Sequence, residues 1–117
     1  MKKVICFDID GVICSTKKSN YKQAIPKQKT IKFINSLYEK GYIIKIFTAR
    51  YMGRNFDNSQ KANKQGYAQT FKQLKKWNLK FHKLIMGKPS YDIFIDDKNL
   101  SFEKKWINIL KNRLKIY

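Results

Sequence analysis

The chain has few cysteines, no long apolar run and few acidic residues, and each shortage makes certain classes of protein less plausible. Its two cysteines, Cys6 and Cys14, are too few for a disulfide-rich secreted domain, and they show no zinc-binding spacing with each other or with the lone His82. No apolar run approaches the ~20 residues that a membrane-spanning helix needs. The first residues show no signal-peptide pattern. We therefore expect reduced thiols, a cytoplasmic location and no contact with membranes.

Acidic residues number only 8 against 26 lysines and arginines, which gives a net charge of +18. Such a charge attracts anions, among them phosphate esters, nucleotides and nucleic acids. Only three of the basic residues are arginines, however, and specific nucleic-acid contacts favour arginine for bidentate hydrogen bonds. The chain is also rich in Asn, Ile, Tyr and Phe, as AT-rich coding tends to produce. We therefore favour compositional drift over nucleic-acid binding as the origin of the charge.

The 117 residues are 43% hydrophobic and 15% aromatic, enough for one domain with a hydrophobic core over 1–117. Hydrophobic periodicity predicts alternating strands and helices. The expected strands are a first one from Val4, then 42–48, 83–86 and 91–97, and the expected helices are 28–40, 60–77 and a last one that starts near Ser101. This alternation predicts a Rossmann-like three-layer α/β sandwich with a mainly parallel central sheet. The polar segment 11–27 is expected to form a loop or small flap.

The few acidic residues are grouped in a way that indicates chemistry. Four of the eight form two close pairs, Asp8 with Asp10 and Asp96 with Asp97, and each pair ends an apolar stretch. Two carboxylates at such a place repel each other unless a cation lies between them or one of them holds a proton. The pairs therefore point to a functional site rather than to packing.

The other two expected strands also end in polar groups. Thr48 ends the strand 42–48, and Lys88 follows the strand 83–86. Because the carboxyl ends of parallel strands meet at one edge of a sheet, these groups and the two aspartate pairs can converge on one crevice. Carboxylates suit a hard cation, whereas a hydroxyl and an ammonium suit anionic oxygens. Together they predict a phosphate-ester site.

Four short motifs, in this order, resemble those of the haloacid dehalogenase-like phosphatase superfamily. They are Asp8-Ile9-Asp10-Gly11-Val12, Phe47-Thr48-Ala49-Arg50, Gly87-Lys88-Pro89 and Ile95-Asp96-Asp97. Each motif alone is weak, but the ordered set from Val4 to about Asn99 is specific. The resemblance implies the haloacid dehalogenase-like fold and Mg²⁺-dependent hydrolysis of a phosphomonoester through an aspartyl phosphate.

By this resemblance, Asp8 is the nucleophile that attacks phosphorus, and Asp10 is the general acid and base. Mg²⁺ is expected to bind Asp8, the backbone carbonyl of Asp10, and Asp96, with waters completing its coordination. Asp97 is expected to act as a water-mediated metal ligand or to orient Lys88. The metal would reduce the repulsion between the nucleophile and the phosphoryl oxygens.

The same resemblance assigns Thr48 and Lys88 to the phosphoryl oxygens, where they would stabilise the transition state. Arg50 and Arg54 are two of only three arginines; Arg50 ends the second motif and Arg54 follows it closely. A guanidinium forms a fork that suits carboxylates and phosphates, so both are candidate substrate contacts. The alternative is an irregular surface loop with a structural Arg50.

Members of this superfamily usually carry a cap domain, for which the gaps between the motifs are too short here. The segment 11–27 suffices for a flap, and 51–82 is filled by a loop, a helix and the approach to the next strand. We therefore expect a capless, open site that takes a bulky substrate or is closed by a neighbouring subunit, in a monomer or a homo-oligomer. In size and in its Phe-Thr-Ala-Arg-Tyr-Met-Gly stretch, the chain is most similar to small capless phosphatases found with bacterial capsule and surface-polysaccharide synthesis genes.

The predicted function is Mg²⁺-dependent hydrolysis of a small phosphorylated substrate, namely a sugar phosphate or a phosphorylated polysaccharide precursor. The alternative is a phosphatase that acts on nucleotides or nucleic-acid ends, which the net charge of +18 favours. A third possibility is a non-catalytic binding or regulatory domain, which the full set of expected catalytic side chains disfavours.

Overall fold

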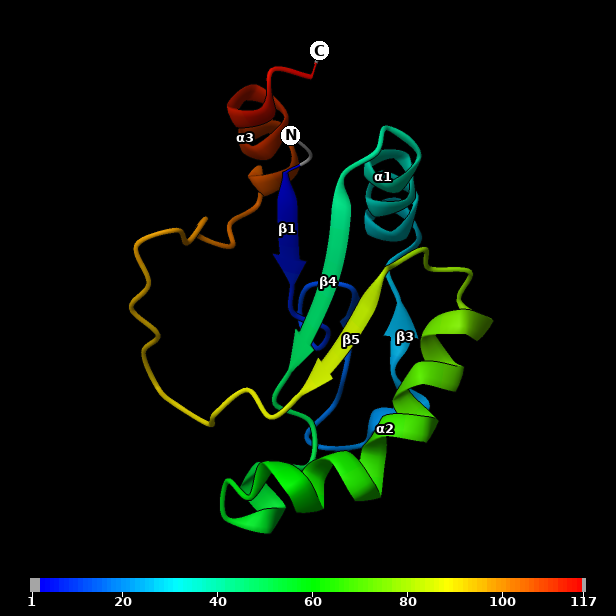
Figure 1. Ribbon diagram of the computed structural model, residues 1–117, viewed down its shortest axis with the longest axis vertical. Helices are drawn as coiled ribbons and strands as arrows, with labels where there is room; N and C mark the ends of the chain where they lie inside the picture. The colour runs from blue at the N-terminus through cyan, green and yellow to red at the C-terminus, as the bar shows by residue number, and fades with distance from the viewer. Residues whose placement is uncertain (1–2, 117) are drawn as a thin grey trace.

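A three-stranded parallel sheet forms the centre of the protein, whose computed structural model describes residues 3–116 (Figure 1). The strands are β1 (Val4–Phe7), β4 (Ile43–Thr48) and β5 (Lys83–Met86), in the order β1-β4-β5. Phe7 pairs with Ile46, and Thr48 pairs with Met86. The three strands therefore point the same way, and their carboxyl ends lie along one edge of the sheet.

Three α-helices flank this sheet. They are α1 (Gln28–Glu39), α2 (Ser59–Lys76) and α3 (Trp106–Leu114). Helix α1 contacts β4 and α2 contacts β5, whereas α3 is joined to β1 and α1 by Trp106, whose ring packs edge-on against Phe7 and Phe33. Across residues 3–116, none of the helices has the length and apolar character needed to cross a membrane.

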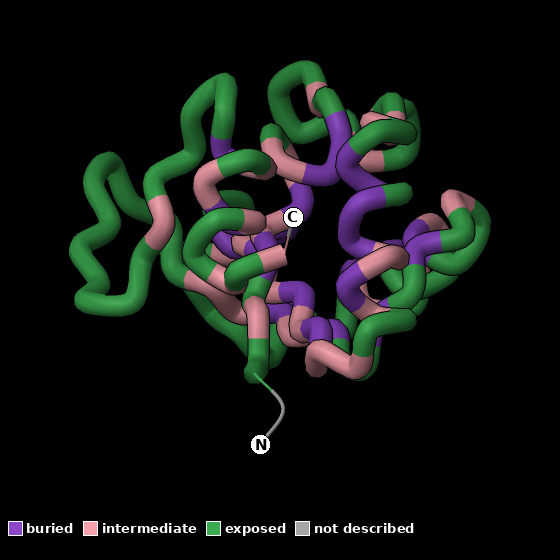
Figure 2. Tube along the Cα trace, turned by 90° about the horizontal axis from the view of Figure 1, so that it is seen from above, coloured by how far each residue is buried: buried purple, intermediate pink, exposed green. Residues whose placement is uncertain are grey.

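One face of the sheet is the core and the other is partly open. Along β4, Ile44, Ile46 and Thr48 are fully buried, whereas the alternate residues, including Lys45 and Phe47, are only partly buried. Figure 2 shows buried residues gathered in the interior of the molecule and long exposed stretches around it. The partly open face gives access to the end of β1.

A small antiparallel strand pair follows β1 within the segment 11–27, which was expected to form a loop or small flap. It consists of β2 (Cys14–Ser15) and β3 (Ile25–Pro26), with the 3₁₀ turn η1 (Tyr21–Gln23) between them; a second 3₁₀ turn, η2 (Gly53–Asn55), precedes α2. No cap domain is inserted between the elements of residues 3–116. The predicted class, a parallel α/β sheet flanked by helices without a cap, is confirmed.

The strand expected over 91–97 is not formed. After Pro89 the chain leaves the sheet edge, and residues 89–105, here called the connecting segment, run as an irregular loop away from β1 (Figure 1). Pro89 has no N–H to donate, and without a neighbouring strand the later residues cannot form a ladder. Ile93 and Ile95 are consequently 80% and 92% exposed. The last helix also begins at Trp106, five residues later than expected.

Candidate active site

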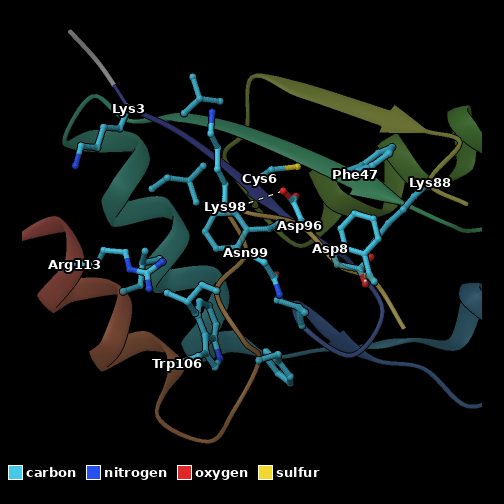
Figure 3. Close-up of a pocket in the computed structure, with 18 of the residues that line it drawn as sticks. Lys3, Cys6, Asp8, Phe47, Lys88, Asp96, Lys98, Asn99, Trp106 and Arg113 are labelled. Atoms are coloured by element: carbon cyan, nitrogen blue, oxygen red, sulfur yellow. Dashed lines mark hydrogen bonds and ion pairs between the residues drawn. The ribbon is translucent and has the colours of Figure 1, made fainter. Parts of the chain in front are cut away.

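A cleft of about 700 Å³ lies along β1 and reaches the carboxyl end of that strand (Figure 3). Its wall contains Asp8, Lys88 and Asp96. The Oδ1 atom of Asp8 accepts a hydrogen bond from the backbone N–H of Ile9 at 2.8 Å, and the Nζ atom of Lys88 lies 3.6 Å from Oδ2. The structure thus joins the predicted nucleophile to the predicted phosphate-binding lysine.

The electrostatics of this pair follow from partial burial. Loss of water raises the pKa of Asp8, and although the Lys88 ammonium and the Ile9 N–H both oppose this effect, they do not cancel it. Burial lowers the pKa of Lys88, but interactions with Tyr91 and Asp8 outweigh burial, and the net shift is upward. Lys88 therefore keeps its positive charge beside a carboxylate whose charge is poorly solvated.

Lys88 is positioned by its backbone. Its N–H donates to the carbonyl of Thr48 at 3.1 Å, which ties the turn after β5 to the end of β4. Gly87 precedes it with φ +97°, and a Cβ atom there would lie 3.0 Å from the Cβ of Ser59 at the start of α2. Glycine suits this turn because the positive φ strains any other residue and a Cβ atom would crowd Ser59.

Thr48 lies at the carboxyl end of β4 with its side chain fully buried. Its Oγ1 atom accepts a hydrogen bond from the backbone N–H of Arg50 at 3.1 Å, and this bond shapes the turn that follows the strand. The structure therefore places the Thr48 hydroxyl next to the site but inside the turn. Its contact with a phosphoryl oxygen stays a prediction.

Asp10 is paired with Arg50 rather than with Asp8. The Nη2 atom of Arg50 lies 2.9 Å from Oδ1 of Asp10, and Nε lies 3.0 Å from Oδ2. Oδ1 also accepts from the hydroxyl of Thr16 at 2.5 Å, and Nη1 of Arg50 donates to Gln73 Oε1 at 2.6 Å. We expected Arg50 to contact substrate, but its buried guanidinium binds these side chains instead.

Arg54 lies outside this buried group. Its guanidinium stacks 4.6 Å from the ring of Tyr51 and 5.4 Å from that of Tyr21, and its Nη2 donates to the carbonyl of Ser19 at 3.3 Å. Arg54 therefore holds the flap against the loop after β4, and its exposed position leaves a substrate contact as a prediction.

The second aspartate pair is placed apart from the first. Asp96 lines the cleft, where its Oδ1 accepts from the backbone N–H of Lys98 at 3.2 Å, and Asp97 is exposed in the same turn. Within residues 3–116, no three carboxylate, histidine or cysteine side chains lie close enough together to hold a metal ion. The metal-ligand roles of both pairs therefore stay predictions.

Sequence reasoning missed several residues that contact the site. Gln73 orients Arg50 from α2, Thr16 contacts Asp10, and the rings of Tyr91 and Phe94 lie 5.3 and 5.4 Å from the Lys88 ammonium. For Gln73 a signal existed, because this polar residue lies beside Leu74 on the buried face of an amphipathic helix. Nothing in the sequence pattern singles out the others.

Comparisons with known proteins give a fold but no close relative. No protein-family model and no curated protein matches the sequence. A crystallised target protein from Vibrio cholerae is similar in structure, with a TM-score of 0.78, 24% identity, and coverage of 96% of this chain and 98% of that one. A D,D-heptose 1,7-bisphosphate phosphatase from B. bronchiseptica, crystallised with magnesium and phosphate, has a TM-score of 0.51 at 14% identity.

The second comparison covers 97% of this chain but 64% of the phosphatase. At these identities the likeness concerns the fold alone, and it agrees with the parallel α/β architecture predicted from the sequence. The fold and the residues at its strand ends thus define an α/β protein with Asp8 and Lys88 together at the carboxyl edge of a parallel sheet.

Proposed function

We propose that the protein is a Mg²⁺-dependent phosphomonoester hydrolase in which Asp8 attacks phosphorus. The observation that supports this best is the pair of Asp8 and Lys88, 3.6 Å apart, at the carboxyl end of β1 in an open cleft. A carboxylate beside a cation at this edge suits attack on an anionic phosphoryl group. The solved phosphatase of similar fold adds to this support.

The proposed reaction has two chemical steps. In the first, an Asp8 oxygen forms a bond to phosphorus, the bond to the leaving oxygen breaks, and Asp10 gives that oxygen a proton. In the second, Asp10 takes a proton from water, the water oxygen attacks phosphorus, and phosphate leaves with Asp8 regenerated. Lys88 holds the phosphoryl oxygens in both steps.

The donors fit Mg²⁺ chemically, since they are hard oxygen atoms: two come from the end of β1 and the others from the connecting segment. Asp8, the backbone carbonyl of Asp10, and Asp96 would hold the ion, with Asp97 bound through water. When bound, Mg²⁺ would offset the negative charges of the nucleophile and the phosphoryl group. Because Asp8 and Asp96 both line the cleft, a cation bound by both would tie the connecting segment to the end of β1.

For the substrate we favour a sugar phosphate or a phosphorylated polysaccharide precursor, of the kind handled by capsule-synthesis phosphatases. The open cleft of about 700 Å³ accommodates a sugar, and no cap restricts its size within the described residues. An open cleft also allows a bulky substrate or a neighbouring subunit to exclude water from the reaction.

Nucleotides or nucleic-acid ends are the second candidate. The net charge of +18 favours them, and so do the aromatic and basic side chains of the cleft wall, among them Trp106, Phe102 and Arg113. Salt separates the two candidates. Counterion release should make the rate on a phosphorylated oligonucleotide fall steeply with salt, whereas the rate on a small sugar phosphate should change little.

The test of the proposed function is phosphate release from sugar phosphates, nucleotides and end-phosphorylated oligonucleotides, with Mg²⁺ or with EDTA. We expect release with Mg²⁺ only, and a loss of ~10³-fold or more in kcat for Asp8→Asn. Asp92→Asn is the matched control, because Asp92 is an exposed acid with no predicted role. Phosphate release by Asp8→Asn at the wild-type rate would exclude this mechanism, and no release by the wild type would indicate a non-catalytic domain.

A further inference from the structure

Arg50 is the largest fully buried side chain of the described residues. Burying a guanidinium removes its water, which is strongly unfavourable unless the charge is paired and its donors are bonded. Here the guanidinium binds the carboxylate of Asp10 as a fork and lies 4.9 Å from the ring centre of Tyr21. This buried contact is the shorter of the two ion pairs described at the candidate site, and the predicted mechanism gives Arg50 no role in it.

The neighbours of Arg50 fix its orientation. Its Nη1 donates to Oε1 of Gln73, while Nε2 of Gln73 donates to the backbone carbonyl of Tyr21 at 2.7 Å. The two bonds determine the orientation of the Gln73 amide, because the reverse orientation would set its NH₂ group against the guanidinium. Helix α2 and the flap thus hold Arg50 from the side opposite Asp10.

The two carboxylate oxygens of Asp10 are bound unequally. Oδ1 accepts from Nη2 of Arg50 at 2.9 Å and from the hydroxyl of Thr16 at 2.5 Å, with Nε of Arg50 at 3.3 Å and the Cys14 thiol at 3.6 Å. Oδ2 accepts only from Nε, at 3.0 Å, among these contacts. Oδ1 is therefore fully engaged, whereas Oδ2 has a free lone pair.

We propose that Arg50 is a positioning residue that anchors Oδ1 of Asp10 and presents Oδ2 for proton transfer to the leaving oxygen. The inference rests on the proposed function of Asp10 as acid and base. It changes the role of Arg50, which supports Asp10 from within the fold and makes no contact with substrate. The side chain of Asp10 is 27% exposed and that of Arg50 is buried, so any access of substrate to this pair is from the Asp10 side.

The leaving group provides a test that a merely structural role would not pass. An alkyl phosphate, such as a sugar phosphate, needs protonation of its leaving oxygen, whereas p-nitrophenyl phosphate needs almost none. For Arg50→Met we expect kcat to fall ~10²-fold or more on the alkyl phosphate and less than ~10-fold on the aryl phosphate, because general acid catalysis typically contributes 10²–10⁴-fold. KM should change little for either substrate.

Three further variants keep the proposal falsifiable. Arg50→Lys keeps the charge but cannot form the fork, so we expect a partial, still selective, loss. Gln73→Leu leaves Asp10 and Arg50 in place and removes the support from α2, so its selective loss should be smaller. Lys72→Met is the control: this exposed residue precedes Gln73 on α2 and has no predicted role at the site, so its substitution should leave both rates unchanged.

The outcomes separate this proposal from the proposed function. If the wild type hydrolyses both substrates and Arg50→Lys and Gln73→Leu lower both rates equally, the positioning role is excluded while the phosphatase stands. If the wild type hydrolyses neither substrate, both the proposed function and the positioning role of Arg50 are excluded. Melting curves of each variant show whether it is folded, and the lysine and leucine variants decide the question if Arg50→Met does not fold.

Discussion

The two parts of the candidate site differ in how the fold supports them. Asp8, Asp10, Arg50 and Lys88 lie at the ends of paired strands, and each has at least one side-chain or backbone partner within 3.6 Å. The connecting segment 89–105, which includes the second aspartate pair, is exposed over most of its length and joins no strand. The part of the site predicted to handle phosphate, here called the packed half, is therefore supported by paired strands. The predicted metal site also needs Asp96 and Asp97, which lie in the connecting segment, here called the loop half.

This difference suggests how the site works. Local stability is low where a segment has few buried contacts and few backbone hydrogen bonds, and functional segments are often found there. A metal ion held by both halves would supply the contact that the connecting segment lacks. The proposed Mg²⁺ would then complete the fold of the site as well as its chemistry.

Among the changes that test this comparison, the largest effect should come from removing the proposed metal contact of Asp96. Asp96→Asn should lower activity by ~10²-fold at low Mg²⁺ and recover part of it at high Mg²⁺, because the losses from changing a metal-site residue are often 10–100-fold. The measurement is phosphate release as Mg²⁺ is titrated, with Asp92→Asn as the control on the same segment. Equal Mg²⁺ dependence of Asp96→Asn and wild type would show that the two halves act independently.

Hydrogen exchange compares the halves directly. Without ligand, backbone amides of residues 91–97 should exchange rapidly, while those of β4 are protected by the sheet. Mg²⁺ with beryllofluoride, a phosphoryl mimic, should slow exchange in 91–97 by ~10-fold or more, and the Asp8→Asn variant should not show this change. Protection of 91–97 in the absence of any ligand would mean that the segment is already held in solution.

The positions of helices and strands were predicted correctly from the sequence where the local hydrophobic pattern agrees with the packing. The alternation of β4 and the apolar stripe of α1 fixed their positions to within a residue or two of the observed ends. It erred over 91–97 because alternating Tyr91, Ile93 and Ile95 indicate a strand only if a partner lies alongside, and no pattern specifies the partner. It also missed the pair of Asp10 and Arg50, whose residues are 40 positions apart and meet only through the tertiary fold.

The packed half should be sensitive to a single methyl group at Gly66. This residue lies in the middle of α2, and a Cβ atom there would lie 2.2 Å from Cδ2 of the buried Tyr51 ring. Alanine favours a helix by about 1 kcal/mol over glycine, but overpacking typically costs 1–3 kcal/mol. We therefore expect Gly66→Ala to lower Tm by several degrees, measured against Lys64→Ala, an exposed position on the same helix. A higher Tm for Gly66→Ala would show that Tyr51 and the loop after β4 shift at little cost to accommodate the new methyl group.

The smallest effect concerns the charge of Asp8 without metal. Folding raises the pKa of this carboxyl above its ordinary value near 3.8, chiefly by burial, so the folded protein binds more protons than the unfolded chain between the two pKa values. Stability should therefore fall as pH rises through this window, and Asp8→Asn should lack that fall. In EDTA at pH 7 the variant should melt about 1–3 °C higher than wild type.

Lys88 gives this last prediction its control, because its ammonium opposes the effect of burial on Asp8. Lys88→Met removes the opposing cation, so it should steepen the loss of stability with pH and lower Tm at pH 7. If Asp8→Asn instead melts lower than wild type at pH 7 and the difference shrinks toward pH 4, the ion pair outweighs burial. Attraction between Asp8 and Lys88 would then help to hold the packed half together. The contrast with the connecting segment would increase, because no cation contacts Asp96 or Asp97 among the ion pairs of residues 3–116.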